Sequence, residues 1–183
     1  MSTVADAARR RRSRSKVTPE APTHEQLLDA VRSAATVADH SELRPWRLIE
    51  FRGDDRLIVG RSIADACGAE GHARDKLTDK ALRAPLIVAV VVSPRESRKV
   101  PYWEQESVAS GVAHLLSLVL DDAGWGVFWR TGVWTRSPEV AHAHGLREGE
   151  QLLGWLYVGG RDRDRDDEKP RKLLDPEAFV STP

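Results

Sequence analysis

The sequence predicts a sheet covered by helices, of the α/β or α+β class. Apolar strand-like segments alternate with segments of helical spacing, in the order α, β, α, α, β, α, β, α, β. Residues 86–92 are seven consecutive apolar residues rich in Val, typical of a strand buried on both faces. With 183 residues, the chain has the length of one domain and can bury a sizeable core.

The N-terminal region predicts a tail, a basic run and then a helix. Residues 1–10 are small and polar, so we expect a disordered tail. The run at residues 9–16 is strongly basic. Thr23 then begins a helix, because Thr23 and Gln26 fit the capping-box pattern. Apolar residues at helical spacing continue this helix to about Val37.

The remaining elements follow in order between Gly, Asp and Pro residues. Helices are expected at 55–67, 73–83, 101–123 and 137–145, and strands at 48–51, 86–92, 126–131 and 152–158. The helix at 101–123 is the longest, and its apolar stretch predicts a central, buried position. The chain therefore divides into a tail (1–10), a folded domain (11–160), and a charged linker with a C-terminal tail (161–183), in which Leu173, Leu174, Phe179 and Val180 could dock on another surface.

Composition and charge exclude several classes of protein. The 28 basic and 28 acidic residues cancel, which argues against a dedicated nucleic-acid binder. A single cysteine allows no intrachain disulfide and fits a reducing compartment. No apolar segment follows the basic run, so it is no signal peptide, and no apolar run reaches membrane-spanning length. We expect a cytoplasmic protein that binds neither nucleic acid nor membrane.

Three stretches concentrate functional side chains, and we expect them to meet at one site. Residues 36–47 follow a helix and carry Asp, His, Arg, Pro and Trp in a short connection. Residues 129–132, Trp-Arg-Thr-Gly, stand at a strand end, where ligands of open sheets bind. Residues 11–13, Arg-Arg-Ser, can clamp a phosphate through guanidinium forks and a hydroxyl.

Each stretch also has a purely structural interpretation. Residues 11–13 fit a basic tail without a partner, or a nucleic-acid arm. Asp39-His40 fits a helix C-terminal turn, where the helix dipole favours His. Trp46 can simply pack the loop on the sheet, and residues 129–132 can be an ordinary turn. His142 and His144 do not share one helix face, so we reject a metal site there.

Taken in order, several motifs resemble the nitroreductase family of FMN-dependent oxidoreductases, in particular its short bacterial NAD(P)H nitroreductases. The resemblance covers about Arg11 to Gly159. The motifs that carry it are Arg11-Arg12-Ser13, Pro19, Ala21-Pro22-Thr23, Asp39-His40, Leu43-Arg44-Pro45-Trp46, Arg83-Ala84-Pro85-Leu86-Ile87, Lys99-Val100-Pro101, Trp103-Glu104-Gln105, Trp129-Arg130-Thr131-Gly132 and Leu156-Tyr157-Val158-Gly159.

The resemblance implies a fold, an assembly and a set of ligand contacts. The fold would be an α+β sandwich whose central mixed sheet is covered by helices, and the protein a homodimer with one FMN per subunit at the interface. The residues that the resemblance assigns to FMN are Arg11, Arg12, Ser13, Trp129, Arg130 and Thr131, with Thr36 and His40 approaching from the partner subunit. Those that it assigns to the nicotinamide nucleotide are Val119, Leu120, Asp121, Asp122, Ala123 and Gly124.

The implied activity is hydride transfer from NAD(P)H, through the flavin, to a small-molecule electron acceptor such as a nitroaromatic compound or a quinone. The two half-reactions would alternate in a ping-pong cycle. The cofactor carries the chemistry and the protein supplies binding and orientation, so no catalytic side chain is expected. A departure at Thr36-Val37-Ala38, where close relatives often have Arg-Ala-Pro, leaves open a flavin-binding protein without turnover. A nucleic-acid binder that uses the basic run is a third alternative.

Overall fold

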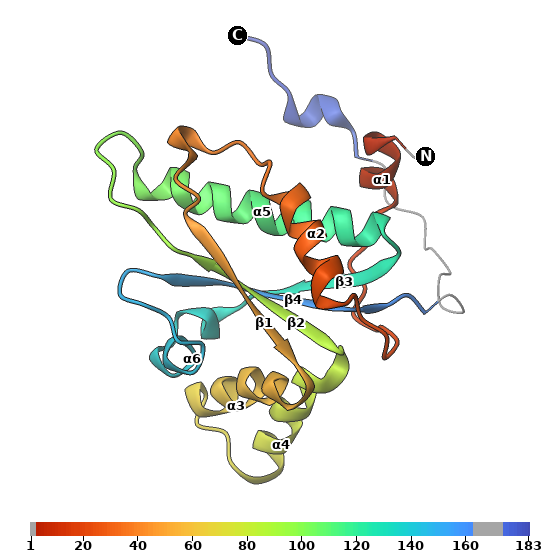
Figure 1. Cartoon of the computed structure of the whole chain (residues 1–183), viewed down its shortest axis with the longest axis vertical. Helices are drawn as coiled ribbons and strands as arrows, with labels where there is room; N and C mark the ends of the chain where they lie inside the picture. Colours follow the sequence, from red (N-terminus) through yellow and green to blue (C-terminus); the bar gives the residue numbers. More distant parts are fainter. Residues whose placement is uncertain (1–2, 163–173) are drawn as a thin grey trace.

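A four-stranded antiparallel sheet forms the centre of the molecule, in a computed structural model that describes residues 3–162 and 174–183. The strand order is β1-β2-β4-β3, so the two most apolar strands are central (Figure 1). The strands are β1 (Trp46–Arg52), β2 (Leu86–Val92), β3 (Trp125–Arg130) and β4 (Gln151–Gly160). Neighbouring strands run antiparallel in all three ladders.

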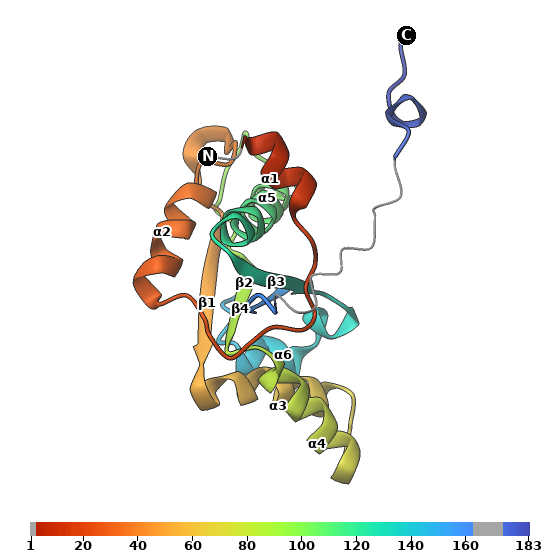
Figure 2. The ribbon, with the colours of Figure 1, turned by 90° about the vertical axis from the view of Figure 1, so that its right-hand side faces the viewer.

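Helices cover both faces of this sheet. Figure 2 shows α2 and α5 on one face and α3, α4 and α6 on the other side. The helices are α1 (Val4–Arg10), α2 (His24–Ala34), α3 (Arg56–Ala66), α4 (Gly71–Asp79), α5 (Tyr102–Asp122) and α6 (Pro138–Ala143). Short 3-10 turns join them: η1 (His40–Glu42), η2 (Gly53–Asp55), η3 (Lys80–Arg83), η4 (Val133–Arg136) and η6 (Pro176–Phe179).

The alternation of side chains along β2 builds two separate cores. Leu86, Val88 and Val90 join the core against α2 and α5, where Leu116 and Leu120 are buried. The intervening residues of β2 face the opposite core, which contains residues of α3, α6 and β4. Every residue of β2 is therefore buried, which confirms the prediction of a strand covered on both faces.

The α+β class is confirmed, but the expected mixed sheet is wrong. The resemblance implied a mixed sheet, whereas the connections return the chain so that each strand runs against its neighbour. The parallel contact that the structure does contain is an isolated bridge between Ser13 and Val127. The N-terminal region, not a full strand, supplies that contact.

Most of the expected disordered tail is helical. Thr3 and Asp6 form a capping box at the start of α1, and Ala7 is buried. Arg10 in the last turn donates to the Asp122 carboxylate at 3.1 Å. These local and tertiary contacts outweigh the polar composition on which the prediction rested.

The predicted charged linker lies largely outside the described residues, as does Leu173 of the predicted docking tail. In the described part of the tail, Leu174, Phe179 and Val180 are exposed. Within residues 3–162 and 174–183, no helix combines the length and apolar character needed to cross a bilayer.

Candidate functional site

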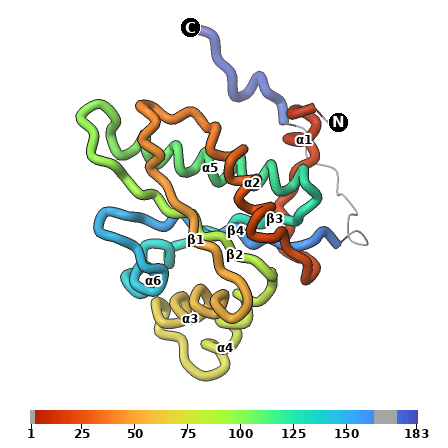
Figure 3. Tube along the Cα trace, viewed as in Figure 1, coloured from red at the N-terminus to blue at the C-terminus, as the bar shows by residue number. Residues whose placement is uncertain are grey.

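A short N-terminal segment crosses the edge of the sheet and forms one wall of a hollow. We call residues 13–18 the strap (Figure 3). The Arg14 amide donates to the Val127 carbonyl at 2.8 Å, and the Thr18 amide donates to the Gly160 carbonyl at 2.9 Å. A Cβ at Gly159 would lie 2.6 Å from Val17 Cγ2, so the strap fits only because this strand residue has no side chain.

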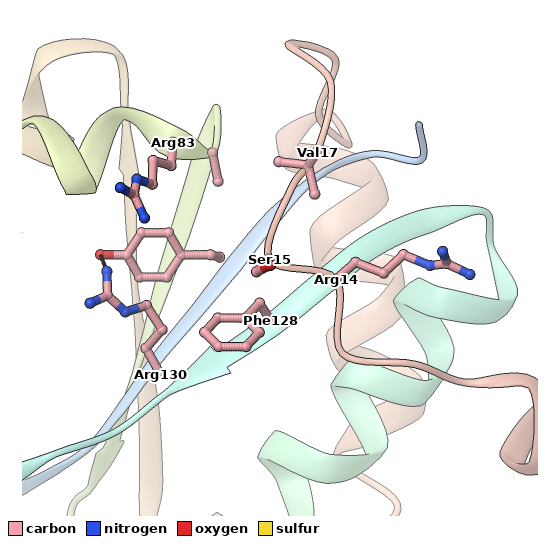
Figure 4. Close-up of a pocket in the computed structure, with 8 residues that line it drawn as sticks. Arg14, Ser15, Val17, Arg83, Phe128 and Arg130 are labelled. Carbon is pink, nitrogen blue, oxygen red and sulfur yellow. Dashed lines mark hydrogen bonds between the residues drawn. The ribbon is translucent and has the colours of Figure 1, made fainter. Parts of the chain in front are cut away.

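The strap encloses a hollow of about 260 Å³ against β3, β4 and the turn before β2. Its walls are formed by Arg14, Ser15, Val17, Arg83, Ala84, Phe128, Arg130 and Tyr157. Figure 4 shows the guanidinium groups of Arg83 and Arg130 on one side and that of Arg14 directed to the other. This strap hollow thus combines an apolar floor with cationic groups at its side.

Two cations surround a buried phenol in the strap hollow. Arg130 lies over the Tyr157 ring, with Cζ 5.1 Å from the ring centroid, and its Nη1 is 3.5 Å from the hydroxyl. Burial raises the pKa of Tyr157, while the charges of Arg130 and Arg83 act in the opposite direction. The phenol is therefore neutral at pH 7, and the two guanidinium groups remain for an anionic or carbonyl group of a ligand.

The three predicted N-terminal residues stand beside this hollow, not in its wall. Arg12 Nη1 donates to the Arg9 carbonyl at 3.0 Å, and Ser13 pairs with Val127. The wall is formed instead by the next two residues, Arg14 and Ser15. The basic run therefore reaches the strap hollow, but through Arg14 and Ser15, which follow the predicted residues 11–13 in the chain.

The predicted strand-end residues separate because side chains alternate along β3. Arg130 lines the strap hollow. Trp129 belongs to the α5 side, where its ring meets His114 edge-on at 4.9 Å. Its buried Nε1 has no hydrogen-bond partner among the described residues. Thr131 is exposed beyond the strand.

His40 and Thr36 do not reach the strap hollow of their own chain. His40 lines a different hollow of about 510 Å³, together with Trp103 and Glu104 at the start of α5. We call this the His40 hollow. Its His40 Nδ1 lies 3.0 Å from Glu104 Oε2. Thr36 is exposed, and its hydroxyl donates to the Ser33 carbonyl at 2.8 Å. The approach of both residues to the flavin of a partner subunit stays a prediction.

The loop that carries His40 has a strained backbone. Ser41, Glu42 and Arg44 adopt φ of 66°, 52° and 48°, a left-handed region that non-glycine residues rarely occupy. The Arg44 amide donates to Asp39 Oδ2 at 2.7 Å, which closes the loop on itself. Backbone strain of this kind persists only where surrounding contacts enforce it, and it clusters at functional sites.

The residues predicted for the nicotinamide nucleotide lie at the end of α5, and two of them are buried. Leu120 and Asp121 are 1% and 2% exposed, and Asp121 pairs with Arg161 at 2.8 Å. Their burial argues against side-chain contacts with a nucleotide, because α5 turns both residues into the protein. Asp122 pairs with Arg10, and Gly124 is exposed.

Val119 and Ala123 line a hollow of about 400 Å³ beside α2. The side chains of Glu25 and Asp29 border it, so we call it the acidic hollow. Two carboxylates make this an unfavourable environment for the phosphates of a nucleotide.

Seven of the eight residues that line the strap hollow, all except Arg130, were not predicted from the sequence: Arg14, Ser15, Val17, Arg83, Ala84, Phe128 and Tyr157. Arg83 belongs to a motif already noted, Arg-Ala-Pro before β2, and its position at a strand start could have marked it. Phe128 pairs with Tyr157 across β3 and β4, so both side chains share one face. That pairing depends on strand register, which the sequence does not state.

Known proteins resemble this chain in sequence and in fold. The model of the nitroreductase family matches residues 8–160. The "Putative NAD(P)H nitroreductase YdjA" of Escherichia coli K12 is 38% identical over 152 residues, covering 81% of this chain and 83% of that protein.

Two solved structures share the fold. One is a nitroreductase-like family protein from Bacillus cereus, with a TM-score of 0.86, 18% identity, and coverage of 100% of this chain and 96% of that chain. The other is the FMN and NADPH-dependent nitroreductase NfnB from Sphigopyxis sp. strain HMH, with a TM-score of 0.76, 14% identity, and coverage of 100% and 99%. The family match and the YdjA identity together show that this chain belongs to the nitroreductase family of oxidoreductases.

Proposed function

We propose that this protein is an FMN-dependent oxidoreductase that transfers hydride from NAD(P)H to a nitroaromatic compound, a quinone or a similar acceptor in a ping-pong cycle. The observation that carries the proposal is the strap hollow. It offers an apolar surface at Val17 and Phe128 and two guanidinium groups at Arg83 and Arg130. A flat ring system with polar carbonyl and nitrogen edges needs both features.

The residues present fit the flavin. When bound, FMN supplies the hydride chemistry. Arg130 and Arg83 would hold a carbonyl or anionic edge of the ring, and Phe128 and Val17 would pack against its faces. Arg11, Arg12 and Ser13, at the entrance of the strap, would contact the phosphate and outer edge, because guanidinium groups bind phosphate oxygens strongly. Trp129 and Thr131 would contribute backbone contacts at the end of β3.

A homodimer would complete the site. The strap hollow has a volume of about 260 Å³, below the roughly 300–1,000 Å³ of typical ligand sites, and it is open on one side. We infer that His40 and Thr36 of a second subunit close it. The exposed aromatic residues Trp103 and Trp134 supply apolar surface suited to such an interface. The cytoplasmic location stays a prediction.

A second function, FMN binding without turnover, is favoured by one observation. Thr36 turns its hydroxyl to the Ser33 carbonyl and stands where close relatives often have a cation. A nucleic-acid role for the basic run is less favoured, because Arg10 and Arg12 are engaged within the chain at Asp122 and at backbone carbonyls.

The visible absorption spectrum of the purified protein, before and after anaerobic NADH or NADPH, tests the proposal. We expect an oxidised-flavin spectrum that bleaches with at least one nucleotide. A bound flavin that stays oxidised would support the protein without turnover. No stoichiometric flavin, even after incubation with FMN, would overturn both functions and leave nucleic-acid binding by the basic run to be tested.

A further inference from the structure

A second hollow of about 350 Å³ adjoins the strap hollow through one shared residue. It lies along α4 and η3, and its walls are formed by His72, Asp75, Lys76, Asp79, Lys80 and Arg83. Arg83 also lines the strap hollow, so its side chain borders both hollows. We call this the basic hollow.

The cations of the basic hollow are available for a ligand. His72, Lys76 and Lys80 follow one another at four-residue spacing and so lie along one face of α4 and its continuation into η3. Within residues 3–162 and 174–183, no ion pair shorter than 4.0 Å joins Lys76 or Lys80 to a carboxylate, although two aspartates are near. No residue of α4 is buried, and Lys76 is exposed, so its side chain is not needed for packing.

Charge distinguishes the basic hollow from the acidic hollow at the end of α5. With His neutral, three cations and two aspartates give the basic hollow a formal charge of +1. Glu25 and Asp29 give the acidic hollow −2. A ligand with several phosphate charges is attracted to the first hollow and repelled by the second.

We propose that the basic hollow binds the phosphate groups of the reductant, including the 2′-phosphate that distinguishes NADPH from NADH. This inference rests on the proposed function. Arg83 lines both hollows, so phosphates bound in the basic hollow would lie beside the flavin ring that we place in the strap hollow. Lys76 and Lys80 determine the specificity, because they supply the charges that only the additional phosphate requires.

The test compares kcat/KM for NADPH and for NADH in the FMN-loaded protein. Wild type prefers NADPH. Lys76→Glu and Lys80→Glu each lower the NADPH:NADH ratio of kcat/KM by about fivefold, the change that roughly 1 kcal/mol of exposed charge interaction produces. Asp79→Asn raises the ratio. The ratio of wild type falls with added salt, since exposed charges are screened.

Lys99→Glu is the matched control, because it reverses the charge of an exposed lysine outside both hollows. Lys99→Glu should leave the NADPH:NADH ratio of kcat/KM within about twofold of wild type. Lys76→Gln removes the positive charge without adding a negative one, so it should lower the ratio less than Lys76→Glu does. An NADH preference of wild type, or an unchanged ratio in both reversal variants, overturns the inference. The inference is also overturned if the two charge-reversal variants lose FMN affinity while the NADPH:NADH ratio is unchanged, because the basic hollow would then bind the phosphate of the flavin. A wild type that neither nucleotide reduces overturns the proposed function instead.

Discussion

The strap hollow and the His40 hollow are made in opposite ways. The strap is held by backbone hydrogen bonds to β3 and β4 and passes over glycines that leave it room. The His40 loop has left-handed residues, an exposed imidazole and an open hollow beside it. The walls of the strap hollow come from a single chain, whereas the His40 loop presents its side chains outward. In the proposed flavin site, each chain therefore supplies its own strap hollow and provides its His40 loop to the site of the partner subunit.

The anchors of the two regions also differ. The strap depends on steric fit, so a small addition to the sheet beneath it would displace it. The His40 loop depends on polar anchors at its ends, Asp39 before the strained residues and Arg47 after them. A polar anchor loses its effect when one partner changes charge or is removed. The two regions should therefore fail under different perturbations.

The largest effect on stability is expected from Gly159→Ala, which tests the steric fit of the strap. The new Cβ would lie 2.6 Å from Val17 Cγ2 and 2.8 Å from the Thr18 carbonyl oxygen. We expect a loss of about 1–3 kcal/mol in the free energy of unfolding, typical of overpacking, together with weaker FMN binding. Urea unfolding and an FMN titration measure the two quantities.

Gly53→Ala serves as the control for that experiment. Gly53 has φ of +50°, but a Cβ added there would have no atom within 4 Å among the described residues beyond its chain neighbours. Only the backbone cost of about 1 kcal/mol therefore applies. Its FMN affinity should equal that of wild type. Equal FMN affinities for Gly159→Ala and Gly53→Ala would mean that the strap does not shape the site.

A smaller effect is expected from mixing two variants, each of which lacks one half of the site. Arg130→Ala removes a charged contact, which weakens FMN binding about ten- to a hundredfold. His40→Ala removes the group that we assign to the partner subunit. After subunit exchange, one of the two sites in each mixed dimer is intact, so activity returns to about a quarter of wild type. Steady-state assays at limiting FMN measure this recovery.

The control mixture combines Arg83→Ala with Arg130→Ala, whose changes fall in the same strap hollow. No mixed dimer then contains an intact site, so activity should remain at the level of the unmixed variants. If the His40→Ala and Arg130→Ala mixture also shows no recovery, the site does not combine the two regions from different chains.

Much of the fold follows from patterns within single segments. The Val-rich run at 86–92 predicts β2, and the Thr23–Gln26 pattern predicts the start of α2, because each signal is local. Strand direction is not local, and the mixed sheet was wrong for that reason. The helix α1 was missed because the burial of Ala7 and the ion pair of Arg10 depend on the tertiary fold, although the capping box at Thr3 and Asp6 is a local signal.

The candidate site was predicted as stretches, not as individual contacts. The two predicted stretches, 11–13 and 129–131, lie beside the strap hollow, but of their residues only Arg130 lines it. Which residue of a stretch faces a hollow depends on register and on the alternation along β3 and β4. Leu120 and Asp121 are turned inward for a related reason, since the rotation of α5 against the sheet decides which side chains are buried.

The smallest effect concerns the polar anchor after the His40 loop. Arg47 donates to Glu150 at 2.8 and 2.7 Å, and these bonds lower the pKa of Glu150 to about 2. A lowered carboxyl pKa stabilises the fold fully above the unfolded value of about 4.5, and the contribution is lost as pH falls toward 2. Glu150→Gln should therefore lower stability by about 1–2 kcal/mol at pH 7, allowing for solvent around Arg47, and by much less at pH 2.

Urea unfolding between pH 2 and 7 measures this difference, with the exposed neighbour Glu148→Gln as control. The control profile should run parallel to that of wild type. If the anchor supports the His40 loop, Glu150→Gln also lowers turnover but weakens FMN binding less than Arg130→Ala does, because the strap hollow keeps all of its contacts. A variant that loses FMN instead would show that the two regions are not anchored independently, and the contrast between a steric and a polar half-site would not hold.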